Sequence, residues 1–183
     1  MPTFIALLRG INVGGAGTLP MKELVAILES LGAKNARTYI QSGNAVFELD
    51  GQAASSAAGK KAFAAKLTAA IDKKRGFAPL VLILDAKEFA RLAAANPYPE
   101  AEPEPKSLHL FFLDAKPAAA NLKALEPLRG PTERYELHKT VLFLHAPDGI
   151  GRSKLAANVE RKLGVLTTAR NWRTVCKLLE IAG

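Results

Sequence analysis

The stretch RTYIQSGNAVFEL, Arg37–Leu49, decides the fold of this 183-residue chain. Residues 37–41 and 45–49 each have the length and residue content of a strand. Ser42-Gly43-Asn44 lies between them, and Gly and Asn tolerate the positive φ that a three-residue hairpin loop requires. We therefore predict a β-hairpin, with two antiparallel strands, in the first part of the chain.

A strand and a helix precede this hairpin. The apolar run Thr3–Arg9 predicts a buried strand that leads into the glycine-rich stretch Gly10–Gly17. Pro20 suits a first helical turn, and apolar residues then recur at helical spacing until Gly32 ends the pattern. The order up to the hairpin is therefore strand, helix, strand, strand.

A helix, a strand and a further helix follow the hairpin. Apolar side chains within residues 63–71 share one helical face, and the run Leu80–Leu84 predicts a strand. Asp85 and Glu88 then form a capping-box pattern, which is typical of a helix start. Asn96-Pro97 ends this last helix.

Residues 97–106 are rich in proline and glutamate and have no apolar periodicity, so we predict a linker. The segments after this linker repeat the order of the first part. They are a strand at Ser107–Leu113, a helix at Ala118–Glu126, a hairpin from Glu133–His138 and Val141–His145, a helix through Leu155, Val159 and Leu163, a short strand at Val165–Thr168 and a last helix from Asn171.

The predicted fold class is α+β, with two tandem ferredoxin-like halves. Each half has the order β-α-β-β-α-β and an extra C-terminal helix, and in such a fold the helices cover one face of an antiparallel sheet. The predicted halves are residues 1–96 and 107–183, joined by the linker 97–106. A single larger mixed sheet is the alternative.

The composition favours a cytoplasmic protein that attracts anions. The formal net charge is +8 and the pI is about 9.7, with the excess concentrated between Arg152 and the C-terminus. The N-terminal apolar run is too short for a signal peptide, and no stretch approaches the roughly 20 apolar residues of a membrane span. With one cysteine, Cys176, and three histidines without zinc-site spacing, we expect neither a metal nor a cofactor.

Four polar segments have the composition of an anion site. They are Arg9–Gly15, Arg37–Asn44, Gly149–Lys154 and Thr167–Thr174. Together they contain Arg, Lys, Asn, Ser and Thr without Asp, Glu, His or Cys, and these side chains donate hydrogen bonds to oxyanions. We predict ligand binding by Arg9, Asn12, Ser42, Asn44, Arg152, Ser153, Lys154, Arg170 and Asn171.

Each of these segments also has a structural interpretation. Gly10–Gly17 precedes a helix start, which favours anions, but it fits neither the dinucleotide fingerprint nor the P-loop, and its glycines suit a tight crossover equally well. Ser153 and Asn171 are plausible helix caps. Trp172 and Cys176 share the apolar face of the last helix, so we expect both in the core, with base stacking by Trp172 as the minor alternative.

Neither RNA recognition nor catalysis has a clear motif. Phe4 and Phe47 fall on the strands where RNA-recognition modules expose aromatic rings, but the sequence around Phe47 does not match their motif, so both are predicted in the core. The polar segments contain no conventional general acid or base. An enzyme remains an alternative, because catalysis could use Tyr39, Ser42, a lysine, or a Glu or His from elsewhere in the chain.

Five further segments stand out along the chain: LLRGINVGG (7–15), TYIQSGNAVF (38–47), NPYP (96–99), GRSKL (151–155) and TTARNWRTV (167–175). Together, and in this order, they resemble the bacterial domain-of-unknown-function family numbered 1697. The resemblance implies a small bacterial cytoplasmic protein and carries over no activity, substrate, cofactor or catalytic residue. This chain has AGTLP at 16–20, where a more basic loop is common in the family.

Three functional hypotheses follow from the sequence. The first is the binding of a phosphate- or carboxylate-bearing small molecule in a basic, Asn- and Ser-rich site between the halves. The second is RNA or DNA binding through the same cations, without a supporting motif. The third is a structural or protein-interaction role, in which the polar segments only tie the chain together. The sequence does not determine the oligomeric state.

Overall fold

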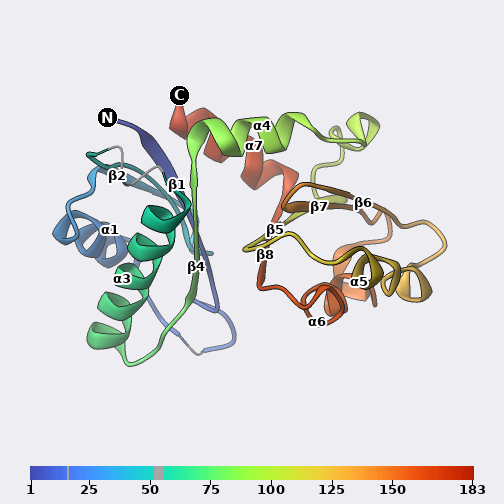
Figure 1. Cartoon of the computed structure of the whole chain (residues 1–183), viewed down its shortest axis with the longest axis horizontal. Helices are drawn as coiled ribbons and strands as arrows, with labels where there is room; N and C mark the ends of the chain where they lie inside the picture. Colours follow the sequence, from blue (N-terminus) through green and yellow to red (C-terminus); the bar gives the residue numbers. More distant parts are fainter. Residues whose placement is uncertain (16, 52–55) are drawn as a thin grey trace. The chain divides into compact units, whose positions relative to one another are not determined.

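The computed structural model describes residues 1–15, 17–51 and 56–183 (Figure 1). Ala16, part of the predicted glycine-rich stretch, lies outside these residues. The chain forms two compact units, one made of Met1–Arg91 with Lys177–Gly183 and the other of Leu92–Cys176. Each unit contains a four-stranded antiparallel sheet.

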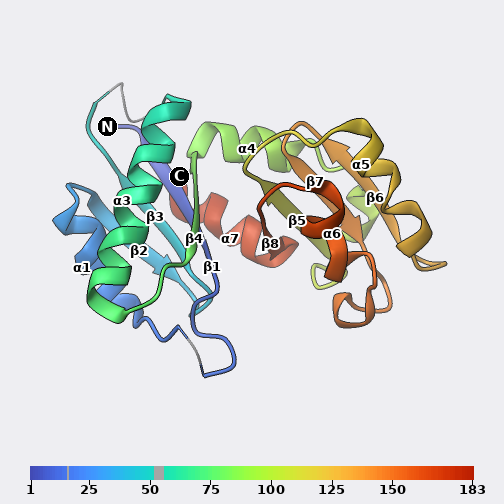
Figure 2. The same ribbon diagram turned by 60° about the horizontal axis from the view of Figure 1, so that its bottom comes forward.

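The first sheet has the strand order β2-β3-β1-β4, which is the order of a split β-α-β fold. The helices α1 and α3 lie side by side on one of its faces (Figure 2), where their apolar side chains pack against the strands. The elements are β1 (Thr3–Arg9), α1 (Met21–Ser30), β2 (Lys34–Tyr39), β3 (Asn44–Glu48), α3 (Ala57–Arg75), β4 (Leu80–Asp85) and α4 (Ala86–Ala94).

The second sheet has the equivalent order β6-β7-β5-β8. Its helices are shorter, and several are single 3₁₀ turns. The elements are η1 (Pro99–Ala101), β5 (Leu108–Leu113), α5 (Ala119–Lys123), η2 (Glu126–Leu128), β6 (Arg134–His138), β7 (Val141–His145), η3 (Ile150–Arg152), η4 (Ala156–Asn158), α6 (Val159–Leu163), β8 (Thr167–Asn171) and α7 (Trp172–Ala182).

These two sheets confirm the predicted tandem ferredoxin-like fold. In both units the first strand lies between the third and the fourth, so the alternative of a single larger mixed sheet is wrong. The extra C-terminal helices of the two halves are α4 and α7. No helix within the described part of the chain is long and apolar enough to cross a membrane.

The two units differ from the predicted halves in three places. Residues 92–96, predicted in the first half, belong to the second unit. The predicted linker 97–106 forms the turn η1, and Tyr98 and Ala101 are buried within the second unit. Residues 177–183 belong to the first unit, where the Arg37 guanidinium donates a hydrogen bond of 2.8 Å to the carbonyl of Ile181. These contacts join segments that are far apart in the sequence, so helical and strand periodicity does not reveal them.

The central strands are buried on both faces. Phe4, Ala6 and Leu8 of β1 pack in the cluster formed with α1 and α3, while Ile5 and Leu7 on the opposite face are also fully buried. In the second sheet, all six residues of β5 are buried. Strands covered on both sides are continuous apolar runs without alternation. This explains why both strands could be predicted from short apolar segments.

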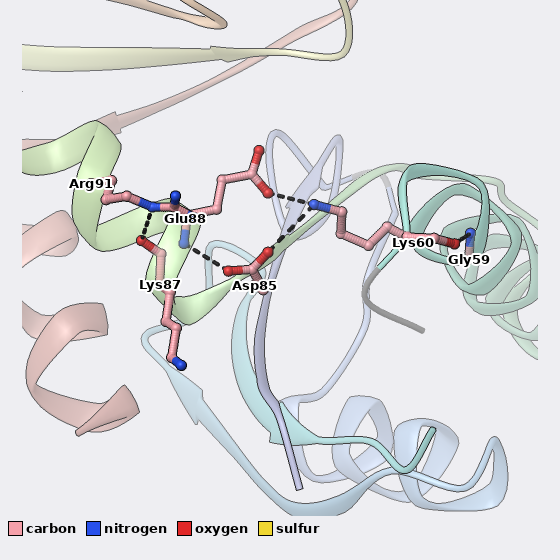
Figure 3. A network of polar contacts seen from close by, with 7 residues as sticks. Gly59, Lys60, Asp85, Lys87, Glu88 and Arg91 are labelled. Carbon is pink, nitrogen blue, oxygen red and sulfur yellow. Dashed lines mark hydrogen bonds and ion pairs between the residues drawn. The ribbon is translucent and has the colours of Figure 1, made fainter. Parts of the chain in front are cut away.

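The start of α4 is held by a polar network (Figure 3). Asp85 Oδ1 accepts a hydrogen bond of 2.7 Å from the backbone N–H of Glu88, as the capping-box pattern predicts. The Glu88 carboxylate pairs with Lys60 of α3, which also lies 3.7 Å from Asp85 Oδ2. One half of the predicted box thus caps the helix, and both carboxylates link α3 to α4.

Candidate functional site

Asn12, a predicted ligand residue, braces the loop between β1 and α1. Its Nδ2 donates hydrogen bonds to the carbonyls of Leu19, at 2.9 Å, and Gln41, at 2.8 Å, while its Oδ1 accepts one from the N–H of Leu19. An asparagine amide has two donor hydrogens, and both are used here. Asn12 therefore joins this loop to the β2–β3 hairpin and has no donor left for an anion.

Asn44 is committed to internal hydrogen bonds in the same way. It is fully buried, and its Nδ2 donates to the carbonyl of Tyr39 and to Ser42 Oγ, at 3.1 and 2.9 Å. These bonds place Asn44 in β3, opposite Tyr39. The hairpin loop is therefore the four residues 40–43 instead of the predicted residues 42–44: it starts two positions earlier, because β2 ends at Tyr39, and it ends one position earlier.

The hairpin loop packs tightly on the end of β1. The carbonyl of Gly43 accepts a hydrogen bond of 2.7 Å from the N–H of Leu8, and a Cβ on Gly43 would lie 2.7 Å from the Leu8 Cβ. Only glycine fits this approach, which also requires a φ of +80°. Ser42 lies in this loop and Arg9 at the adjoining strand end, so the structure brings together the four predicted residues of the first unit.

Two predicted residues of the second unit act as caps of helical turns. Ser153 Oγ accepts a hydrogen bond of 2.9 Å from the N–H of Ala156, and Asn171 Oδ1 accepts one of 2.9 Å from the N–H of Thr174. The helix predicted after Ser153 is the turn η4 followed by the five-residue α6. The structural interpretation of both side chains is therefore supported, because their oxygens satisfy backbone donors.

The three cations of the second unit differ in environment. Arg152 and Lys154 are exposed, and their side chains make no hydrogen bond or ion pair within residues 1–15, 17–51 and 56–183. Arg170 is buried and donates to Thr168 Oγ1 and the carbonyl of Ala169, at 2.9 and 2.8 Å. Burial lowers the pKa of its guanidinium to about 10.

The nine predicted ligand residues are divided between the two units. Arg9, Asn12, Ser42 and Asn44 lie in the first, and the other five lie in the second. That both sets bind one ligand stays a prediction. No group of three His, Cys, Asp or Glu side chains in the described ranges is placed to hold a metal ion.

The aromatic side chains considered for base stacking are in the core. Phe4 and Phe47 are almost fully buried with ring centroids 6.0 Å apart, and they belong to the cluster under α1 and α3. Trp172 is also buried, as predicted. The prediction for Cys176 is wrong, because its side chain is exposed: the buried face of α7 runs through Val175 and Leu178.

A cavity of about 520 Å³ opens on the surface of the second unit, and the sequence did not predict it. It lies between α5, η2, the start of β6 and the turn before η1. Its volume is in the range of sites for small molecules. Eight residues line it: Tyr98, Leu122, Lys123, Glu126, Arg129, Glu133, Arg134 and Tyr135.

Arg134 is held at the edge of this cavity by three partners. Its guanidinium carbon lies 4.8 Å from the centroid of the Tyr98 ring. Its Nη2 pairs with the Glu100 carboxylate and lies 3.0 Å from His145 Nδ1. The hydrogen bond from Arg134 holds the pKa of Glu100 below its usual value, while burial and the Arg134 charge lower that of His145. These three contacts favour one orientation of the Arg134 side chain before any ligand binds.

A second group of lining residues is joined by hydrogen bonds. Arg129 binds the Glu126 carboxylate at 2.8 Å and the carbonyl of Glu133 at 3.2 Å, and the Tyr135 hydroxyl donates to Glu126 at 3.0 Å. Hydrogen bonds from Arg129 and Tyr135 lower the pKa of Glu126. Burial and the bond to Glu126 raise the pKa of Tyr135 to about 12. Glu126 is thus ionised and already paired.

The positive charge of the cavity is only partly neutralised. Glu133 is buried, and its carboxylate accepts a hydrogen bond of 2.7 Å from the N–H of Gly130. The exposed Lys123 ammonium makes no hydrogen bond or ion pair with any described residue. Tyr98 belongs to the NPYP motif, but the other lining residues lie in ordinary mixed-charge segments. No sequence pattern showed that they would meet.

Comparison with known proteins shows a family and a fold without an activity. Residues 1–143 match the family described as "Protein of unknown function (DUF1697)". Among solved structures, the conserved bacterial protein SP0830 from Streptococcus pneumoniae is similar, with 21% sequence identity and a TM-score of 0.71 over 100% of this chain and 99% of its own. No curated protein matches the chain in sequence. The likeness to SP0830 is one of fold.

Proposed function

The chain belongs to the DUF1697 family of proteins of unknown function, and we propose that it binds a small molecule carrying a phosphate or carboxylate group in the cavity of its second unit. The observation that carries this proposal is the set of hydrogen-bond donors around the cavity. Three cations line it, and the Lys123 ammonium has no partner among the described residues. The chemical class of ligand is that expected from the sequence, at a different place in the chain.

The two arginines retain donors for such a ligand. An arginine has five N–H groups. The contacts of Arg129 to Glu126 and Glu133 use Nε, Nη1 and Nη2 once each, while those of Arg134 use Nη2 alone. The remaining hydrogens include those on Nε and Nη1 of Arg134. Charge-assisted bonds from such groups to phosphate or carboxylate oxygens are strong.

The acidic groups of the cavity oppose anion binding only weakly. Glu126 already accepts hydrogen bonds from Arg129 and Tyr135, and Glu133 is buried against a backbone N–H. Counting Glu100, which pairs with Arg134, three carboxylates balance the three cations, so the attraction for an anion comes from the unpaired Lys123 ammonium and from the unused arginine N–H groups. A cytoplasmic location, which we also propose, would give the protein access to phosphorylated metabolites.

A panel of phosphate- and carboxylate-bearing compounds tests the proposal by thermal unfolding of the full chain. A compound present at 100 times its Kd should stabilise the folded state by roughly 2.7 kcal/mol. We expect Lys123→Gln to weaken binding about tenfold, because it removes the unpaired cation of the cavity. The matched control is Lys139→Gln, which removes an exposed lysine of the β6–β7 turn and should leave the affinity unchanged.

Two outcomes would count against this site. If no phosphate or carboxylate compound stabilises the wild-type protein, the proposed ligand class is wrong. If Lys123→Gln and Lys139→Gln weaken binding equally, the effect comes from the overall charge of the protein and the cavity is not the binding site.

A further inference from the structure

Arg134 presents a flat cationic surface to the cavity. One face of its guanidinium lies over the Tyr98 ring, and Nη2 is held by Glu100 and His145. The Arg134 side chain is nevertheless 49% exposed. Its Nε and Nη1 have no hydrogen-bond partner among the described residues, and Tyr98 occupies one side, so a ligand can approach Arg134 from the side away from Tyr98.

A fixed guanidinium plane of this kind suits a planar, π-electron-rich ligand. Arginine stacks on aromatic rings because the plane of the guanidinium is delocalised and weakly hydrated. Nucleobases stack on arginine planes in the same way as on aromatic side chains. The cation–π contact with Tyr98 occupies one side of Arg134, so a base on the other side would place the guanidinium between two rings.

We propose that the ligand of this cavity is a nucleotide, whose base stacks on Arg134 and whose phosphate binds Lys123 and Arg129. This inference rests on the proposed function, because it assigns the anionic group of the ligand to the same cavity. The Nε and Nη1 hydrogens of Arg134 lie in the guanidinium plane and would remain available to the ribose oxygens beside the stacked base. Lys123 lies on α5 and Arg129 follows η2, whereas Arg134 lies at the start of β6.

The size of the cavity favours a free nucleotide over a nucleic-acid strand. A volume of about 520 Å³ accommodates one small ligand. Non-specific binding of a strand needs a positively charged groove that follows the phosphate backbone, with aromatic platforms for successive bases. Here Glu100 contacts the single platform and Glu126 and Glu133 line the same cavity, so no continuous positive groove is present at this site.

The test compares three probes by isothermal titration calorimetry with the full-length protein. They are adenosine 5′-monophosphate, ribose 5-phosphate and adenosine. We expect the nucleotide to bind at least tenfold more tightly than either fragment. Arg134→Lys should abolish its advantage over ribose 5-phosphate while leaving ribose 5-phosphate binding within about threefold, since lysine keeps the charge and loses the plane.

The outcomes separate this inference from the proposed function. If ribose 5-phosphate binds as tightly as the nucleotide, the nucleotide assignment is overturned while the anion site stands. If neither phosphate compound binds, both are overturned. If a single-stranded oligonucleotide binds more than tenfold tighter than the mononucleotide with a steep salt dependence, a strand-binding surface replaces the assignment.

A second measurement uses the wild-type protein and so does not depend on whether a variant folds. The NMR signal of the Arg134 Hε should move upfield when adenosine 5′-monophosphate binds, because a base stacked on the guanidinium shields it. The Hε signal of Arg161, which is held by Asn158 outside the cavity, is the internal control. Binding of the nucleotide without an upfield movement at Arg134 would overturn the stacking assignment.

Discussion

At the scale of single residues, Ile40 adopts a backbone conformation that β-branched residues rarely occupy. Its φ is +49°, and its side chain is 51% exposed in the hairpin loop. A left-handed backbone costs an ordinary L-residue about 1–2 kcal/mol because Cβ approaches the next carbonyl oxygen, and Asn tolerates it better. We expect Ile40→Asn to raise the free energy of unfolding by about 1 kcal/mol, measured by urea denaturation.

Val13 provides the control for this substitution. It is 70% exposed on the neighbouring β1–α1 loop, and its φ is not positive. Val13→Asn should change the free energy of unfolding by less than about 0.5 kcal/mol. If both substitutions stabilise the protein equally, the gain comes from removing an exposed apolar side chain, and backbone strain at Ile40 is not its cause.

His109 should make the stability of the protein depend on pH. It is buried in β5, its Nδ1 has no hydrogen-bond partner in the described structure, and burial lowers its pKa to about 4. The unfolded chain binds this proton near pH 6.5, so stability is highest above that pH and falls as the pH drops toward 4. A pKa difference of about 2.5 corresponds to roughly 3 kcal/mol. Urea denaturation at pH 7 and pH 4 should show this loss.

A substitution at His109 should remove most of this dependence. We expect His109→Phe to lose less stability than the wild type between pH 7 and pH 4, because no buried imidazole remains to be protonated. The dependence should not vanish, since burial also lowers the pKa of His145. His138→Gln serves as the control and should keep the wild-type decline. If the free energy of unfolding of His109→Phe falls as much as that of the wild type between pH 7 and pH 4, groups other than His109 cause the loss.

The sequence showed which loops contain polar residues, but it did not predict the hydrogen-bond partners of those residues. Asn12 and Asn44 have the residue type of an anion site, yet their amide hydrogens all bind backbone carbonyls or Ser42. Whether an amide faces a ligand or its own backbone depends on φ and on contacts between distant segments. Conversely, Arg134 and Tyr98 are 36 positions apart, and their contact arises only from the folded unit.

At the scale of elements, Asp85 at the start of α4 can stabilise the protein in two ways, by capping the helix and by its charge. Asp85 caps Glu88 and approaches Lys60 (Figure 3). Asp85→Ala should lower the free energy of unfolding by about 1 kcal/mol, because it leaves a helix N–H without its acceptor. Thermal or urea unfolding would measure the loss.

Asp85→Asn is the matched variant, because Asn caps helices as well as Asp and lacks the charge. We expect it to retain most of the stability, since Lys60 keeps its pair with Glu88. If Asp85→Asn is as destabilising as Asp85→Ala, the ion pair with Lys60 makes the larger contribution and the capping interpretation fails.

Element types were predicted better than element ends. The first hairpin was predicted from Gly43 and Asn44, but Asn44 pairs with Tyr39 as part of β3. The helix expected after Ser153 has the correct apolar spacing, yet it forms a 3₁₀ turn and the five-residue α6. Apolar spacing reports which face is buried, whereas the exact ends depend on the caps and turns that the rest of the unit permits.

At the scale of the whole molecule, the repeated order of elements was sufficient to predict two sheets of the same topology. Strand and helix order follows from local periodicity, and the β-α-β-β-α-β order has few compact solutions. The assignment of Lys177–Gly183 to the first unit was not predictable, because it depends on contacts such as that between Arg37 and Ile181. The cavity was missed for the same reason.

The discontinuity of the first unit affects the order in which the two units are completed during translation. Residues 1–91 are translated long before Lys177–Gly183, so this unit lacks seven of its residues until all of the second unit has been translated. The second unit, one continuous segment, is complete earlier. Although N-terminal domains usually fold first during translation, here the N-terminal unit is the last to be finished.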